Sequence, residues 1–449
     1  MRYGRTVVAV AILSLALCTF ADDKPVLIRN ASLIVTMDPA LGSGPLGTIE
    51  NADVLFDRSG ILAVGPNLTH ADAEIVDGTN RIVMPGFVDT HDHLLQSGIR
   101  GCGTDHDLIG WLARCAAPLR TVGLSDAEAY ALTRLSTLGL ISTGVTTTVD
   151  WESPASRGVA EGLVRALSDS GMRFQFACRP AFIGGATELR RIKRELLDPN
   201  PLAALQVAAA PLPAELSASG ALARELGVLL HVHVLENIAQ RGENQWAALV
   251  GSNALGPNLF MAHAIHLSDD EIAQAAAAGA RVGHNPLSNM RLASGIIRFP
   301  ELPNAGIRIG LGLDGGTNDT TDAFNNMRAA VGLQRVKTLS ASAYPTVADV
   351  LRMATLGGAE ALGQSDRIGS LTPGKQADVI VIDAGGINFA PRIDWLSQLV
   401  FNGQPSNVER VYVAGRALKA NGQLVGVNER KIVADAEAAA SRIGAALPR

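Results

Sequence analysis

An alternation of strand-like and helix-like segments runs through residues 85–363 and restricts the folds that the chain can form. Strand-like segments lie at 144–150, 173–178, 227–234, 259–263, 280–284 and 307–314, and helix-like segments at 124–140 and 156–170. A long series of such units indicates a parallel sheet, and about eight of them indicate a closed (β/α)8 barrel. Active sites of such barrels lie at the carboxyl ends of the strands. Polar residues that end the apolar runs are therefore candidate site residues.

Both ends of the chain are rich in short β-like segments separated by turns. These segments lie at 26–28, 32–35, 53–56 and 61–64, and again at 377–382 and 408–415. Turn residues between short β-branched runs are typical of antiparallel strands. We therefore expect a small β-sandwich built from both chain ends. We expect the N-terminal part of the sandwich at 22–84 and the barrel at 85–363. The C-terminal part of the sandwich and a terminal helix are expected at 364–449.

Two histidines one residue apart end the first apolar run of the barrel region, in the stretch PGFVDTHDH at 85–93. On a strand, His91 and His93 share a face and Asp92 points away from them. Further strand ends carry His231, His233 and, three residues later, Glu236. His263 ends the strand-like segment at 259–263, and Asp314 ends the one at 307–314.

Three imidazoles and one carboxylate around an open position form a typical catalytic Zn²⁺ site, although Fe²⁺ or Mn²⁺ accepts the same ligands. The spacing leaves open whether His231 or His233 is the third imidazole ligand, because both share a strand face. Metal-assisted hydrolysis also needs a proton donor for the leaving group. Glu236 stands close enough in the sequence to supply it.

These motifs resemble the amidohydrolase superfamily, in the branch of cytosine, guanine and S-adenosylhomocysteine deaminases and triazine hydrolases. The resemblance covers about 25–422 and rests on the stretch at 85–93, His-x-x-Glu at 233–236, His263 with HLS at 266–268, HNPLSN at 284–289, GLGLDG at 310–315 and GSLTPGKQAD at 369–378. It implies a hydrolase that acts on non-peptide C–N bonds, with one divalent metal, Zn²⁺ by preference. A small-molecule substrate and a homodimer or larger assembly are also implied.

The resemblance assigns roles to individual residues. His91, His93, His233 and Asp314 are the implied metal ligands, and His231 is then a supporting residue. Glu236, His263 and Asp314 are the implied catalytic residues: Asp314 accepts a proton from the metal-activated water, Glu236 protonates a ring nitrogen, and His263 holds the attacking group. The strand region at 173–181 has no lysine, which favours one metal ion over two.

Substrate contacts are implied for five residues, namely Gln96, Arg100, Trp111, Ser288 and Asn289. The expected reaction is hydrolytic deamination of an aminated N-heterocycle of purine, pyrimidine, pterin or triazine type. The alternatives are removal of an N-alkyl, amide or halide group on the same scaffold, and an exported binding protein without catalysis. Two residues depart from the pattern: Asp92 between the histidines, and Leu313 before the metal-site aspartate.

The first residues resemble a secretory signal peptide, with Arg2 and Arg5 before an apolar run at 7–17 and small residues ahead of a cleavage site after Ala21. They predict export, to the periplasm in a bacterium, with a lipid anchor at Cys18 as a lesser alternative. Removal of 1–21 leaves Cys102, Cys115 and Cys178, which we expect to be buried and free; a disulfide between the first two is possible in an oxidising compartment.

Other classes of protein lack support in the sequence. A net charge of -5 without a long basic run gives no footprint for nucleic acid. No later apolar run is long enough for a membrane helix. Phosphate-binding loops and the His-x-Glu with Pro-Cys-x-x-Cys zinc deaminase motif are absent from the sequence.

Overall fold

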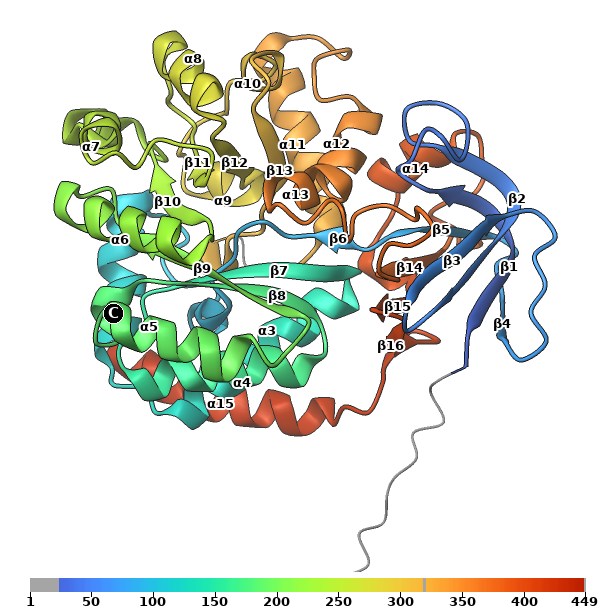
Figure 1. The fold of residues 1–449 in the computed structure, drawn as a ribbon, viewed down its shortest axis with the longest axis horizontal. Helices are drawn as coiled ribbons and strands as arrows, with labels where there is room; N and C mark the ends of the chain where they lie inside the picture. The colour runs from blue at the N-terminus through green and yellow to red at the C-terminus, as the bar shows by residue number, and fades with distance from the viewer. Residues whose placement is uncertain (1–23, 318–319, 448–449) are drawn as a thin grey trace, which may run out of the picture.

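The computed structural model describes residues 24–317 and 320–447, which form a barrel and a second, mixed sheet (Figure 1). The predicted signal peptide at 1–21, with Cys18, lies outside the described residues. The barrel strands run in the order β13-β12-β11-β10-β9-β8-β7-β6, and all their pairings are parallel. They are β6 (Phe87–Val88), β7 (Val145–Glu152), β8 (Arg173–Cys178), β9 (Ala203–Ala209), β10 (Leu230–Val234), β11 (Leu259–His263), β12 (Arg281–His284) and β13 (Arg308–Leu311).

Backbone hydrogen bonds join the first strand of the barrel to the last. Thr90 N donates to Leu311 O at 2.9 Å, and Asp314 N donates to His91 O at 2.9 Å. These bonds lie just beyond the carboxyl ends of β6 and β13. They close the parallel sheet at the end where a barrel carries its active site.

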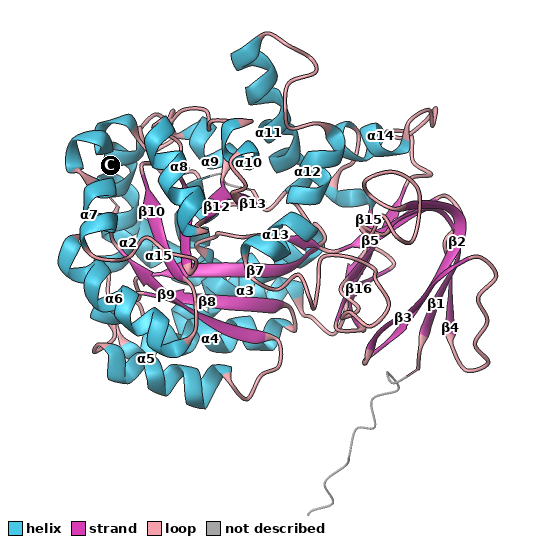
Figure 2. Cartoon of the chain, turned by 45° about the horizontal axis from the view of Figure 1, so that its top comes forward, coloured by secondary structure: helices cyan, strands magenta, loops and turns pink. Residues whose placement is uncertain are grey.

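Helices surround the barrel strands (Figure 2). Strand β7 is buried along its whole length, as expected for a parallel strand covered on both faces. The helices are α1 (Leu108–Trp111), α2 (Ala117–Thr121), α3 (Asp126–Ser142), α4 (Arg157–Ser170), α5 (Ala186–Ile192), α6 (Pro213–Leu226), α7 (Gln245–Gly251), α8 (Asp269–Ala278), α9 (Pro286–Arg291), α10 (Glu301–Asn304), α11 (Ala323–Thr338), α12 (Val347–Met353), α13 (Leu356–Ala361), α14 (Trp395–Phe401) and α15 (Glu429–Ala446).

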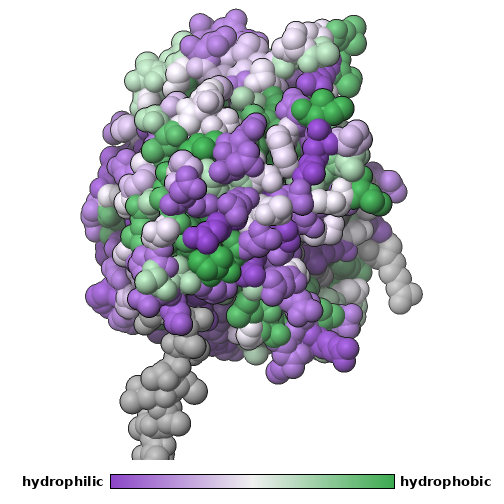
Figure 3. All heavy atoms as spheres, turned by 90° about the vertical axis from the view of Figure 1, so that its right-hand side faces the viewer, coloured by the Kyte–Doolittle hydropathy of each residue, from purple (hydrophilic) through white to green (hydrophobic). Residues whose placement is uncertain are grey.

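The mixed sheet combines strands from both chain ends, in the order β17-β16-β15-β14-β5-β1-β2-β3, with β4 paired to β1. Its strands are β1 (Val26–Val35), β2 (Thr48–Asp57), β3 (Gly60–Gly65), β4 (Glu74–Asp77), β5 (Arg81–Pro85), β14 (Val379–Asp383), β15 (Val408–Val413), β16 (Arg416–Ala420) and β17 (Gln423–Leu424). The two ends meet where β5 pairs antiparallel with β14. The predicted barrel with a β-structure from both ends is thus confirmed; the domain boundaries stay predictions. On the side of the molecule that carries the mixed sheet, polar and apolar residues are interspersed on the surface (Figure 3).

The first strand merges two predicted ones. The segments 26–28 and 32–35 belong to one continuous β1, interrupted by a register shift between Ile28 and Ala31. Asn30 lies in this bulge with a φ of 56°, and asparagine tolerates that left-handed conformation better than most residues. The turn signal in the sequence therefore marks a bulge.

Residues that link the mixed sheet to the barrel are closely packed. The chain passes from β5 into β6 through Gly86, where an added Cβ would lie 2.1 Å from the side chain of Thr146. The C-terminal helix α15 returns to the barrel and lies beside α3 (Figure 1), with Arg442 and Glu128 paired at 2.6 Å. The segment that follows β5 and the helix α15 therefore both contact the barrel.

A buried ion pair also fixes this junction. The Arg173 guanidinium, at the start of β8, donates to both oxygens of Asp378, at 2.9 and 3.1 Å. Asp378 Oδ1 also accepts from Ala414 N at 2.8 Å, and both charged residues are buried. Loss of one partner would leave a buried charge without compensation.

We predict that Asp378→Ala lowers the free energy of unfolding by about 3–5 kcal/mol, because it leaves the buried Arg173 guanidinium without its partner. Denaturant unfolding followed by circular dichroism measures the change. Glu225→Ala is the control, since the Arg190–Glu225 pair is exposed; it should leave the transition unchanged. Equal transitions for both variants would contradict the structural role of Asp378.

Candidate metal centre

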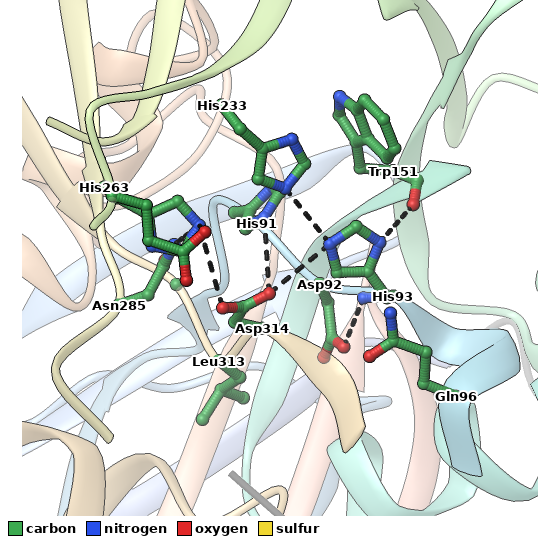
Figure 4. Close-up of polar contacts among 12 residues, drawn as sticks. His91, Asp92, His93, Gln96, Trp151, His233, His263, Asn285, Leu313 and Asp314 are labelled. Carbon is green, nitrogen blue, oxygen red and sulfur yellow. Dashed lines mark hydrogen bonds and ion pairs between the residues drawn. The ribbon is translucent and has the colours of Figure 1, made fainter. Parts of the chain in front are cut away.

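The two histidines of the first strand face the barrel interior together. They lie just beyond β6, where a bridge between Asp92 and Asp150 continues the pairing with β7. Asp92 turns away from the histidine rings, and its Oδ1 accepts from His93 N at 2.6 Å (Figure 4). His91 and His93 therefore project toward one point, as the alternation of side chains on a strand requires.

Three other strand ends meet the same point. His233 is on β10, His263 ends β11, and Asp314 follows β13 (Figure 4). His263 and Asp314 have φ values of 70° and 60°. Non-glycine residues in this region carry backbone strain, which is frequent at functional sites. Gly312 is needed nearby, because an added Cβ would lie 3.0 Å from His91 Cβ and 2.2 Å from Asn285 Oδ1.

Donor atoms converge around one small volume. Asp314 Oδ1 lies 3.5 Å from His91 Nε2 and 3.4 Å from His93 Nε2, and His93 Nε2 lies 3.3 Å from His233 Nε2. His263 Nε2 is 3.8 Å from Asp314 Oδ2 and 3.5 Å from Glu236 Oε2. Three overlapping groups have ligand atoms within 4.8 Å of one another: His91, His233 and His263; His91, His93 and Asp314; Glu236, His263 and Asp314.

This arrangement fits a divalent metal ion. His91 Nε2 is fully buried and has no hydrogen-bond partner among the described residues, although it points into the cluster. Burial lowers the pKa of His93 to about 4 and that of His263 to about 3, and it lowers the pKa of His233 strongly. Neutral imidazoles are the form that binds metal. The set of nitrogen and carboxylate donors suits Zn²⁺, Fe²⁺ or Mn²⁺.

The two carboxyl groups of the cluster have different environments. Burial raises the pKa of Glu236 well above its usual range, and the charge of Asp314 adds to this effect. Burial also acts to raise the pKa of Asp314, but the contact with His91, whose Nε2 lies 3.5 Å away, and the charge of His263 outweigh it, so the pKa is lowered. Opposite pKa shifts in two neighbouring carboxyl groups are typical of an acid and a base in one site.

Other residues orient the imidazoles. His93 Nδ1 lies 2.6 Å from Trp151 O, so it donates to that carbonyl and leaves Nε2 for the cluster. The amide Nδ2 atoms of Asn289 and Asn285 lie 2.9 and 3.2 Å from His263 Nδ1. An amide nitrogen donates, so His263 Nδ1 accepts and Nε2 carries the proton. His263 is therefore a hydrogen-bond donor toward the carboxylates.

A cavity of about 200 Å³ opens beside the cluster. Gln96 and Trp111, two of the predicted substrate contacts, line it. Arg100 borders a separate hollow with Ser97 and Thr321, outside this cavity. Ser288 and Asn289 are buried in α9, behind His263. The tertiary structure therefore brings two of the five predicted contact residues into the cavity.

Sequence reasoning missed several residues at this site. Trp151 and Glu152 end β7 and line the cavity, as does Arg120 of α2. The polar end of the strand at 144–150 was a usable signal, because it has the same form as the other strand ends. Cys102 and Cys115 were expected to be free, and this is wrong: they form the disulfide that was the alternative, with their Cα atoms 6.0 Å apart. Of the cysteines in the described residues, only Cys178 is free and buried, as expected.

Comparisons with known proteins agree with this geometry. The amidohydrolase family model matches residues 82–418. The 5-methylthioadenosine/S-adenosylhomocysteine deaminase of Pelotomaculum thermopropionicum is 31% identical, over 93% of this chain and 98% of that protein. The 5'-deoxyadenosine deaminase of Methanosphaera stadtmanae is 30% identical, over 88% and 96%. A zinc-bound adenosine deaminase from Xanthomonas campestris superimposes with a TM-score of 0.83 and 27% identity, over 94% and 98%.

The predicted export to a periplasm, and with it the lipid anchor at Cys18, is wrong. The relatives that match nearly the whole chain are deaminases of nucleosides and related metabolites, and their names indicate no exported enzyme. The inference of export rested on residues 1–21 alone, which lie outside the described residues. Among the described residues, no helix has the length and apolar character needed to cross a membrane.

We predict that His233→Ala reduces bound divalent metal from one ion per chain to a substoichiometric amount, because it removes one imidazole from the cluster. Metal content after dialysis, measured by mass spectrometry, tests this. His284→Ala is the control: His284 is a buried histidine that ends β12, but it is outside the three groups. Full metal content in His233→Ala would contradict the assignment.

Proposed function

Because the chain belongs to the amidohydrolase family, we propose that it deaminates an aminated N-heterocycle of purine or related type by metal-dependent hydrolysis. It is a hydrolase that acts on carbon–nitrogen bonds other than peptide bonds. The observation that carries the proposal is the convergence of two carboxyl groups on His263, whose Nε2 lies 3.5 Å from Glu236 Oε2 and 3.8 Å from Asp314 Oδ2; their pKa values are also shifted in opposite directions. One carboxyl group can donate a proton while the other accepts one.

The proposed metal ligands are His91, His93, His233 and Asp314, with Zn²⁺ as the preferred ion. A bound divalent ion lowers the pKa of water to about 7 and so makes a nucleophile available at neutral pH. The adenosine deaminase that superimposes on this chain has zinc bound. The unpartnered His91 Nε2 supports this assignment.

The protein side chains move the protons. Asp314 accepts one proton from the attacking water while the water oxygen bonds to the ring carbon that bears the amino group. Glu236 protonates the adjacent ring nitrogen, and the Nε2–H of His263 stabilises the negative charge that develops on the attacking oxygen. The hydroxyl group of the adduct then returns a proton to Glu236, and the proton on Asp314 passes to the amino group, which leaves as ammonia.

Recognition of the rest of the substrate falls to the cavity walls. Apolar side chains form most of the lining, and Trp111 and Trp151 supply flat aromatic surfaces. Planar heterocycles bind well against such side chains. Gln96 Oε1 accepts from Gly316 N at 3.1 Å, which leaves its amide NH2 available to a ring acceptor.

We predict that the metal-loaded protein releases ammonia from at least one member of a panel of aminopurines and their nucleosides, aminopyrimidines, pterins and aminotriazines. Glu236→Gln should lower kcat by about a hundredfold or more, because it removes the proton donor. Glu243→Gln is the control, since this exposed residue contacts Gln245 outside the cavity. Absence of ammonia from every compound would refute deamination, and amide, N-alkyl and halide leaving groups would then be tested.

A further inference from the structure

Four buried side chains form an unbroken chain of hydrogen bonds through the barrel interior. His91 Nδ1 lies 3.0 Å from His231 Nε2, and His231 Nδ1 lies 2.7 Å from Gln206 Oε1. Gln206 Nε2 donates to Gln175 Oε1 at 2.5 Å, and Gln175 Nε2 donates to Leu362 O at 3.5 Å. Gln175, Gln206 and His231 come from the consecutive strands β8, β9 and β10. The chain thus runs from the metal centre toward the opposite end of the barrel.

The last acceptor fixes the direction of every bond in this chain. Leu362 O is a backbone carbonyl and can only accept, so Gln175 must turn its NH2 group toward it. Gln175 Oε1 then accepts from Gln206 Nε2, which leaves Gln206 Oε1 to accept from His231. If the Gln175 amide were reversed, its Oε1 would face the carbonyl oxygen of Leu362, and neither atom could donate. Every hydrogen bond between His231 and Leu362 therefore has its donor on the His231 side and its acceptor on the Leu362 side.

This direction determines which nitrogen of His91 is free to bind metal. His231 Nδ1 carries a proton because it donates to Gln206 Oε1, so its Nε2 accepts from His91 Nδ1. His91 Nε2 is then left with its lone pair, and this is the buried atom that lacks a partner within the metal cluster. Partners of this kind commonly fix the tautomer and orientation of metal-binding histidines.

We propose that His231, Gln206 and Gln175 are positioning residues that set the tautomer of His91 and so raise the metal affinity of the site. His231 acts from the inside of the barrel and is not itself a ligand. The proposal concerns metal binding and is independent of which bond the enzyme hydrolyses.

We predict that Gln206→Met lowers Zn²⁺ affinity by about 10–100-fold, the range found when such partners are removed. Competition with a chromophoric chelator measures the dissociation constant, and the visible spectrum of the Co²⁺ form reports ligand geometry. His231→Phe should act in the same way. Unfolding of the metal-free proteins, followed by circular dichroism, monitors the fold.

Phe260→Leu is the matched control, because its ring packs against that of His231 at 4.4 Å without taking part in the hydrogen bonds. It should destabilise the fold and leave Zn²⁺ affinity and the Co²⁺ spectrum unchanged. The proposal is overturned if Gln206→Met binds Zn²⁺ within about twofold of the wild type. It is also overturned if Phe260→Leu weakens binding as much as Gln206→Met, since packing alone would then explain the effect.

Discussion

Pairing between the first and last strands of the barrel is the constraint on which the metal centre depends. The bond from Asp314 N to His91 O holds two cluster residues, far apart in the sequence, within one backbone hydrogen bond of each other. Without this closure nothing would hold Asp314 beside His91 and His93. The strained φ of Asp314 and the close approach of Gly312 to His91 are consequences of the same closure. The surrounding fold stabilises a local geometry that the segment would not adopt by itself.

Buried carboxyl groups beneath the histidines hold the strand ends in place. Asp89 accepts from Thr148 Oγ1 at 2.6 Å and from Leu313 N at 2.9 Å, and burial raises its pKa to about 7. Asp150 accepts from Leu94 N at 2.9 Å. Asp92, the residue that departs from the family pattern, belongs to this layer, and its Oδ1 caps the backbone of His93. These groups face away from the cavity, so they shape the site through the backbone.

The polar interior of the barrel has a function in this arrangement. Most barrel interiors are filled by branched apolar side chains, whereas here Gln175, Gln206 and His231 occupy adjacent strands. Each finds a partner, as buried polar groups must. A fully paired chain avoids the cost of burial and fixes the orientation of the groups at its ends. The metal centre is in this way connected to the core rather than only to the loops around it.

The sequence by itself determined the barrel, the composite sheet and the residues that end the strands, because apolar periodicity and strand-end polarity are local properties. It gave no sign of β9, whose alanine-rich segment has weak β propensity and becomes a strand by pairing with β8 and β10. Only the tertiary structure decided that His231 turns to His91, that Arg100 lies outside the cavity and that Cys102 meets Cys115. These outcomes depend on contacts between segments distant in the chain, and such contacts follow from packing rather than from spacing.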